Sequence, residues 1–361
     1  MGLRVGCYTS PHLASPRERI RIGAEPLDED RFAEAIATVV RVEEAHGLGP
    51  RTWFDTVTSA GFLVFADEAV DVAIVEVGML GRFDSTNVVE AEVAVITNVG
   101  LDHTDGGPGW RRRVAGEKAG IITAGRPVVL GENDQELRGI VGAEAPSVVV
   151  ALGDSLTLRR NDLAVGGRLI DVGTPRGHHE DLYVRLHGAH LGANAAVAIA
   201  AAEEFFDAAL TEEVVTEAFA TVEVPGRLEV VHHDPLVVVD AAHNQPGARA
   251  LAVAVEEAFG GRARRYLVVG MQDGRDPQAL LEALGAPGYE LVVTCTAPTA
   301  RGIDADELAG AARGAGARVD AVHDLATALD HVASLASPED MVVVAGSITV
   351  VGDARRIVDD W

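Results

Sequence analysis

Two residues of this sequence, Glu76 and His103, have types and positions suited to metal chemistry. Glu76 lies near the end of the apolar run 70–77, and His103 comes soon after the apolar run 91–97. A carboxylate inside an apolar strand is costly unless it is paired or bound to a metal. Ligands of open α/β sheets bind beyond the carboxyl ends of the strands, so we expect the two side chains to meet there. With a nearby hydroxyl they suit Mg²⁺ and a nucleotide; the alternative is a buried Glu–His hydrogen bond.

Lys118 is the only lysine among 30 lysine and arginine residues. A codon bias toward arginine explains why lysine is rare in this sequence, but it does not explain why a lysine remains at position 118. A primary amine can lose its proton and become a nucleophile or a carbamate, whereas a guanidinium stays protonated. We therefore consider a chemical role for Lys118; the alternative is a solvated ion pair with Glu117.

A second group of polar residues follows the apolar run 236–239. It reads Asp240-Ala241-Ala242-His243-Asn244 and precedes a Pro-Gly pair and a helical pattern. Polar groups between a strand and a helix N-terminus suit a ribose or a phosphate, although an ordinary turn with an asparagine cap has the same appearance. Arg227, between the two halves of the chain, is placed to reach a phosphate or to form a hinge salt bridge.

Short apolar runs alternate with amphipathic stretches, which is the pattern of βαβ units around a mostly parallel sheet. We expect helices over 31–45, 57–68, 190–206 and 211–221, and strands over 70–77, 91–97 and 127–130. Lys118 is expected to open the connection before the last of these strands, and residues 147–186 a small antiparallel insert. After Pro225 and Gly226 we expect the strands of a Rossmann-like domain at 236–239, 266–269, 291–295, 317–322 and 341–344.

Composition limits the class of protein. The 361 residues are 48% hydrophobic and carry a net charge of −25, so we expect folded domains and no non-specific binding to nucleic acid or anionic membrane. Two cysteines, Cys7 and Cys295, cannot form a disulfide framework. The first residues lack the pattern of a signal peptide, and no apolar run reaches the ~18 residues of a membrane helix. We expect a two-domain, cytoplasmic α/β protein that is monomeric.

Eight stretches of the sequence occur in the same order as in one protein family. Together they indicate a resemblance that no single motif would. They are TSPHL with RERIRI (9–22), EVGMLGRFDSTNV (76–88), ITNVGLDHT (96–104), EKAGI (117–121), HGAHLGANAAVA (187–198), PGRLE (225–229), DAAHN (240–244) and AGSITVVGDAR (345–355). The chain resembles the folylpolyglutamate synthase/dihydrofolate synthase branch of the Mur ligases. The resemblance implies an α/β protein with a P-loop-NTPase-type central domain over 1–222 and a smaller Rossmann-like domain over 223–361.

The resemblance also implies a reaction and a set of roles. ATP would phosphorylate a folate or dihydropteroate carboxylate, and the amine of L-glutamate would displace the phosphate to form an amide. The implied Mg²⁺ ligands are Ser10, Glu76, His103 and a carbamylated Lys118, of which the last three are also the implied catalytic residues. The implied nucleotide-binding residues are Asn194, Arg227, Asp240, His243 and Asn244. The implied substrate-binding residues are Thr52, Phe83, Asp84 and Ser85 on the folate side, and Arg275 and Asp276 on the glutamate side.

The sequence departs from the family pattern in three places. It contains no G-x-x-x-x-G-K-[ST] phosphate loop, and it starts at what resembles the family's second strand. We expect this to reflect a misassigned start or a truncation, and we expect residues 1–361 alone to bind ATP poorly. Gly274-Arg275-Asp276 replaces an acidic-Lys-acidic triplet, and Leu191 stands where the family has glutamine.

Two alternatives to a folate ligase stay open. One is a Mur-type ligase for a different carboxylate substrate. The other is a non-catalytic relative that binds folate without turnover, which the missing phosphate loop favours and the shared presence of Ser10, Glu76, His103 and Lys118 disfavours.

Overall fold

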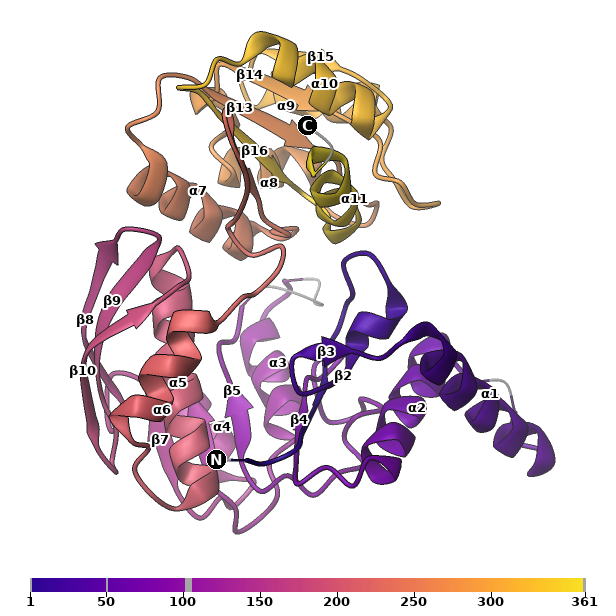
Figure 1. The fold of residues 1–361 in the computed structure, drawn as a ribbon, viewed down its shortest axis with the longest axis vertical. Coiled ribbons are helices and arrows are strands. Elements are labelled where there is room, and N and C mark those ends of the chain that lie inside the picture. The colour runs from indigo at the N-terminus through magenta and orange to yellow at the C-terminus, as the bar shows by residue number, and fades with distance from the viewer. Residues whose placement is uncertain (1, 50, 101–105, 360–361) are drawn as a thin grey trace.

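The first sheet carries the start of the chain and the end of the first apolar run. The computed structural model describes residues 2–49, 51–100 and 106–359. Strands β1 (Val5–Tyr8), β2 (Ile20–Ile22), β3 (Glu25–Pro26) and β4 (Val72–Val75) form a sheet of order β3-β2-β1-β4, in which β1 is parallel to β4. Helices α1 (Glu29–Ala45) and α2 (Trp53–Asp67) supply its apolar cover. Figure 1 shows these two helices extending to one side of the molecule.

A second, parallel sheet follows, of order β5-β6-β7. Its strands are β5 (Ala94–Ile96), β6 (Val128–Leu130) and β7 (Val149–Ala151), and helices α3 (Trp110–Ala119) and α4 (Gln135–Gly142) pack against it. Within the described residues β4 and β5 are each the outer strand of their sheet. Their apolar side chains are correspondingly open, with Ile74 58% and Val95 36% exposed.

An antiparallel sheet and two helices complete the first half of the chain, which ends before β11. Strands β8 (Thr157–Ala164), β9 (Gly167–Gly173) and β10 (His178–Val184) pair in the order β10-β9-β8. Helices α5 (Ala189–Phe206) and α6 (Glu212–Thr221) pack with this sheet in one core, whose buried centre includes Ile170, Val184 and Ile199. The alanine-rich sequence of α5 allows it to lie close to its neighbours.

The second half forms one six-stranded sheet between two layers of helices, drawn above the rest in Figure 1. Its order is β11-β12-β16-β13-β14-β15, and only the edge strand β11 (Glu229–His233) runs antiparallel to its neighbour. The other strands are β12 (Leu236–Val239), β13 (Arg265–Val269), β14 (Leu291–Thr294), β15 (Val319–Ala321) and β16 (Met341–Ala345).

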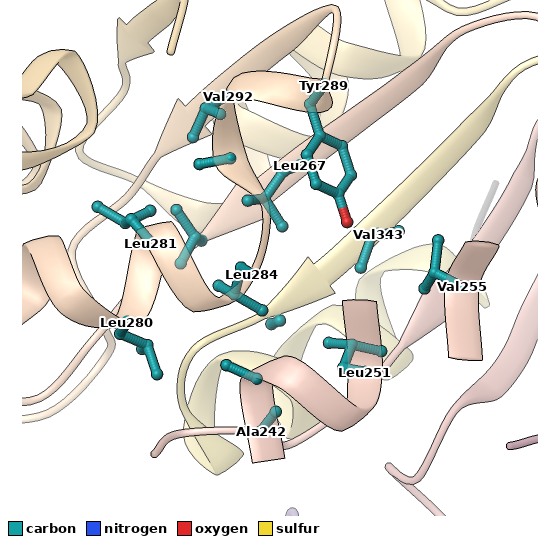
Figure 2. Close-up of a cluster of buried hydrophobic side chains, with 14 of the residues drawn as sticks. Ala242, Leu251, Val255, Leu267, Leu280, Leu281, Leu284, Tyr289, Val292 and Val343 are labelled. Atoms are coloured by element: carbon teal, nitrogen blue, oxygen red, sulfur yellow. The ribbon is translucent and has the colours of Figure 1, made fainter. Parts of the chain in front are cut away.

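Helices cover both faces of this sheet, as its continuous apolar strands require. On one face lie α7 (Gln245–Phe259), α8 (Pro277–Ala283) and α9 (Ala305–Gly314), and on the other α10 (Leu325–Leu335) and α11 (Ile348–Val358). Figure 2 shows the first face, where Leu251 of α7 and Leu281 of α8 point toward Leu267 and Val343 of the sheet.

The expected helices and strands agree with the structure in type and differ slightly from it in position. Every helix and strand expected above is present, with shifted bounds. Three expectations were wrong in detail. Val149–Ala151 joins the parallel sheet and not the antiparallel insert, because it pairs with β6. Glu76 follows β4 and does not lie inside it, and Lys118 lies in α3 and not in a connection.

The described helices include none that is long and apolar enough to span a lipid bilayer.

Candidate active site

Glu76 and Ser10 lie together just beyond the carboxyl ends of two neighbouring strands. Because β1 and β4 are parallel, Ser10 after β1 and Glu76 after β4 reach the same edge, where the Ser10 N–H donates to Glu76 Oε2 at 2.8 Å. Desolvation by the surrounding protein raises the pKa of the Glu76 carboxyl, although the residue is exposed at the surface. The Ser10 N–H and the charges of Arg227 and Arg19 offset part of that rise. A carboxylate with opposing charges at a sheet edge is the arrangement expected for a metal or phosphate site.

The turn after Glu76 packs directly on the end of the helix that carries Lys118. The Arg82 N–H donates to Glu117 O at 2.9 Å, and a Cβ atom at Gly81 would lie only 2.9 Å from the same oxygen. Only glycine allows this approach, so Gly81 determines how closely the turn and α3 come together. The half-buried Lys118 therefore lies at the same edge of the fold as the turn that follows Glu76.

The turn also contacts the start of α2. Thr52 caps α2 in a reciprocal capping box with Asp55, and the Ser85 hydroxyl donates to the other Asp55 oxygen in a short hydrogen bond. Asp84 accepts from the N–H groups of Met79 and Thr86, so its carboxylate shapes the turn. Phe83 is left 87% exposed beside it. The four predicted folate-side residues thus belong to one structural unit, held together by Asp55.

A ring cluster that sequence analysis missed lies next to this unit. The Arg19 guanidinium lies 4.7 Å from the centre of the Trp53 ring, and its Nε donates to His12 Nδ1 at 3.0 Å. The Trp53 ring is half exposed, and it directly follows Thr52. The pattern Thr-x-x-Asp at 52–55 is the sequence signal that marks this helix start.

Asp240 organises the junction between the two halves of the chain. Its carboxylate is 6% exposed and accepts from the N–H groups of Leu228 and Ala242, both at 2.8 Å. Burial raises the pKa of the Asp240 carboxyl, and these N–H groups together with the charges of Arg227 and His190 offset part of the rise. The Arg227 charge acts on Glu76 and on Asp240, which lie on different halves of the molecule. Arg227 therefore lies between the two predicted binding regions.

The residues after Asp240 take the geometry of a strand-to-helix turn. The Asn244 side chain caps α7 by accepting from the Gly247 N–H at 2.9 Å, so the asparagine cap that the sequence left open as the alternative to a ligand site is present. His243 Nδ1 hydrogen-bonds to the Ala241 carbonyl at 2.9 Å, a contact that places the donor hydrogen on Nδ1. Asn194 lies on the first half of α5 with its side chain exposed.

Leu13 carries the Ser10 segment into the second half of the molecule. Its side chain packs with the core beneath α11, and a Cβ atom at Gly226 would lie 2.9 Å from it. Gly226 immediately precedes Arg227. The loop after β1 and the loop that carries Arg227 are thus in direct contact.

The remaining predicted residues lie elsewhere or outside the description. Asp276 caps α8 by accepting from the Ala279 N–H at 3.1 Å, next to Arg275 in the loop after β13. His103 lies outside the described residues, so its expected position opposite Glu76 stays a prediction.

Comparison with known proteins supplies the family. Residues 35–202 match the model described as the Mur ligase middle domain, and residues 226–348 match the Mur ligase, glutamate ligase domain. The dihydrofolate synthase/folylpolyglutamate synthase of Mycobacterium tuberculosis is 36% identical, over 98% of this chain and 80% of that protein. The chain belongs to the folylpolyglutamate/dihydrofolate synthase branch of the Mur ligase family.

Solved structures of this Mur ligase branch share the fold. A Mycobacterium tuberculosis folylpolyglutamate synthase complexed with ADP and AMPPCP superposes with a TM-score of 0.92 at 36% identity, over 99% of this chain and 85% of that one. A bifunctional folylpolyglutamate synthase/dihydrofolate synthase with Mn, AMPPNP and L-glutamate bound gives a TM-score of 0.86 at 30% identity, over 98% and 82%. The α/β architecture implied by the resemblance is therefore confirmed.

The described residues of this Mur ligase fit a divalent cation. Glu76 Oε2 accepts the Ser10 N–H, whereas the hydrogen bonds among described residues leave Oε1 without a donor. A carboxylate oxygen next to Ser10, whose side chain carries a hydroxyl, offers the hard oxygen ligands that Mg²⁺ prefers, and the exposure of Glu76 leaves space for waters.

Proposed function

We propose that this chain catalyses the ATP-dependent addition of L-glutamate to folate or dihydropteroate. The observation that carries the proposal is similarity along nearly the whole chain to dihydrofolate synthase/folylpolyglutamate synthases. The placement of Glu76, Lys118 and Arg227 at facing ends of two halves supports it. The substrate carboxylate is activated as an acyl phosphate, which the glutamate amine then attacks with loss of phosphate.

The residues divide this work by position. We propose that Thr52, Phe83, Asp84 and Ser85 form the folate side, with the exposed Phe83 ring against the flat pteridine and the other three fixing the turn. Arg275 and Asp276 are proposed to bind L-glutamate. Asn194, Arg227, Asp240, His243 and Asn244 are proposed to form the nucleotide site. Arg227 would oppose the charge of the transferred phosphoryl group, which is the main catalytic requirement of that step.

Mg²⁺ is the proposed cation, with Ser10, Glu76, His103 and a carbamylated Lys118 as its ligands. When bound, the ion neutralises phosphate oxygens and polarises the transferred group. The chain's own part is to hold these ligands at one edge of the fold: β1 and β4 fix Ser10 and Glu76, and α3 fixes Lys118.

We further propose that residues 1–222 and 223–361 are the two domains, and that the protein is a cytoplasmic monomer. Light scattering coupled to size exclusion tests the monomer, for which we expect a mass near 37.8 kDa.

The test of function is a ligation assay on the purified chain. ATP, Mg²⁺ and L-glutamate are supplied with dihydropteroate or with a reduced folate, and the glutamylated product is identified by mass spectrometry. We expect one ADP released per amide bond formed. Folate binding without product would favour the non-catalytic alternative, and turnover only with other carboxylates would favour a different Mur-type substrate.

A further inference from the structure

The nucleotide-side residues sit on two halves of the molecule, and α7 is the element that joins them. Its C-terminal part packs on the turn that leads into α5. The His187 and Phe259 ring centres are 5.1 Å apart, and a Cβ atom at Gly188 would lie 3.3 Å from the Ala254 Cβ. The N-terminal end of the same helix follows His243 and Asn244. The docking of α7 therefore determines where these residues lie relative to α5.

An ion pair between a buried arginine and an exposed glutamate crosses this contact. Arg168 of β9 is only 1% exposed, and its guanidinium donates to Glu257 Oε2 of α7 at 2.8 Å. Glu257 keeps 35% of its side-chain surface exposed. A buried charge is tolerated only when partners replace its lost hydration, and breaking such a pair by removing one partner is strongly destabilising. Glu257 is the carboxylate that compensates Arg168 across the contact.

The other side of the Arg168 guanidinium reaches α5 through Asn161. Arg168 donates to both the side-chain and the main-chain oxygen of Asn161 in short hydrogen bonds. Asn161 Nδ2 in turn donates to the Ala189 carbonyl in the first turn of α5 at 2.8 Å. A Cβ atom at Gly192 would lie 2.4 Å from Asn161 Oδ1, so the asparagine is seated directly on that turn.

We propose that Arg168 and Glu257 are positioning residues for the ligation, because they fix α7 relative to the first turn of α5 and so fix Asn194 relative to His243 and Asn244. The inference rests on the proposed function for the meaning of those three residues, but not for the existence of the contact. Neither member of the pair touches substrate; both act through the elements they hold. His190, the second residue of α5, lies in the electrostatic field of both Asp240 and Arg227, so α5 starts beside the junction.

The charged character of the pair matters for its effect. If Glu257 loses its charge, Arg168 stays buried without a counter-ion. The smallest change that restores hydration to the guanidinium is a movement of α7 that admits water. Loss of the charge is therefore expected to loosen the junction more than the loss of one contact would.

The test compares Glu257→Gln with Glu256→Gln. Glu256 is the preceding residue of α7 and pairs with Arg265, within the second half of the molecule, so it controls for loss of one helix carboxylate. For Glu257→Gln we expect the KM for ATP to rise roughly tenfold while kcat changes less than about threefold, as for the loss of a buried charge partner that acts on geometry. For Glu256→Gln we expect neither parameter to change by more than about twofold.

Hydrogen exchange without nucleotide gives a readout that needs no activity. We expect faster exchange in peptides covering 187–194 and 250–259 for Glu257→Gln, and wild-type exchange for Glu256→Gln. The double variant Arg168→Met/Glu257→Gln removes both charges, and we expect it to be less impaired, in KM and in exchange, than the sum of Arg168→Met and Glu257→Gln predicts. Equal exchange and kinetics in the two glutamine variants, or strictly additive effects, would overturn the proposal. If the wild-type chain shows no ligation, exchange and its response to the double variant still decide the positioning role, and only the proposed function fails.

Discussion

Two of the predicted ligand-binding acids use their carboxylates on the protein itself. Asp84 accepts N–H groups of its own turn, and Asp240 accepts those of Leu228 and Ala242. Such a residue shapes a site by fixing backbone, and its neighbours meet the ligand. For Asp240 the neighbour is Arg227, whose loop it pins, and for Asp84 it is the exposed Phe83.

Lys118, the only lysine of the sequence, allows the most direct test of a single residue's role. We expect Lys118→Arg to keep the fold, because the half-buried position on α3 tolerates another long cation, and to abolish ligation, because guanidinium cannot form a carbamate. The measurement is product formation at saturating ATP, with circular dichroism as the control for folding. Wild-type turnover in the arginine variant would remove the carbamate role.

Asp340 gives a pH-dependent prediction that is independent of function. It is fully buried, which by itself raises its pKa, but Arg264 and the N–H and hydroxyl of Ser337 lower the pKa to about 2. A pKa below the unfolded value means that the stabilisation is present above about pH 4 and is lost as the pH falls toward 2. We expect about 2 kcal/mol of acid-labile stability, absent in Asp340→Asn. Urea unfolding at pH 7, 4 and 2.5 measures it, with the exposed-pair variant Asp353→Asn as control.

At the scale of elements, the folate side depends on two pieces that are distant in sequence. The N-terminus of α2 and the turn after β4 meet through the hydrogen bond between Ser85 and Asp55 and through the packing of Gly78 on Phe54. The exposed rings of Trp53 and Phe83 are carried by these two pieces. The relative placement of the rings is therefore set by a hydrogen bond between elements.

Removing that hydrogen bond should affect one substrate selectively. For Ser85→Ala we expect the KM for the pteridine substrate to rise about fivefold at unchanged KM for ATP, with about 1 kcal/mol or less lost in stability. Steady-state kinetics with each substrate varied in turn provide the measurement. The control is Thr56→Ala, which changes the same helix but takes no part in the hydrogen bond between Ser85 and Asp55. An equal rise in both KM values would contradict the assignment of Ser85 to the folate side.

In the whole molecule, two of the contacts between the halves are specific enough to test. One is the Arg168–Glu257 contact, and the other is the Leu13 loop against α11. A Cβ atom at Gly352 of α11 would lie 2.2 Å from the Leu13 carbonyl oxygen, so this contact exists only because residue 352 is glycine. The same loop carries Ser10.

Gly352→Ala should consequently separate Ser10 from the second half. We expect a loss of roughly 1–3 kcal/mol in stability from the forced overlap, and a fall in ligation of at least about tenfold, the change that 1.4 kcal/mol in the barrier produces. Gly310→Ala on α9 is the matched control, because nothing lies within 4 Å of a Cβ there, and we expect it to stabilise by roughly 0.5–1 kcal/mol. Thermal unfolding and the ligation assay distinguish the two outcomes; full activity in Gly352→Ala would show that this contact does not position Ser10.

The alternation of strands and helices, the break near Pro225 and the residue types that could bind metal and nucleotide can all be read from the sequence alone. These are local properties, because the apolar period of 2 or 3.6 residues and the polar residues after an apolar run are legible without any long-range contact. That Ser10 belongs with Glu76 was implied by the family resemblance alone, and the parallel pairing of β1 with β4 brings the two residues together.

How these helices, strands and polar residues come together is visible only in the tertiary structure. The contact of α3 with the turn after Glu76, the hydrogen bond from Ser85 to Asp55, and the membership of Val149–Ala151 in the parallel sheet all depend on partners far along the chain. Asn161, Arg168 and Glu257 have no local signal, since each is an ordinary surface residue type whose role appears only when β8, β9 and α7 come together. Contacts between residues so distant in sequence are selected by packing and by the cost of burying charge, which no local pattern encodes.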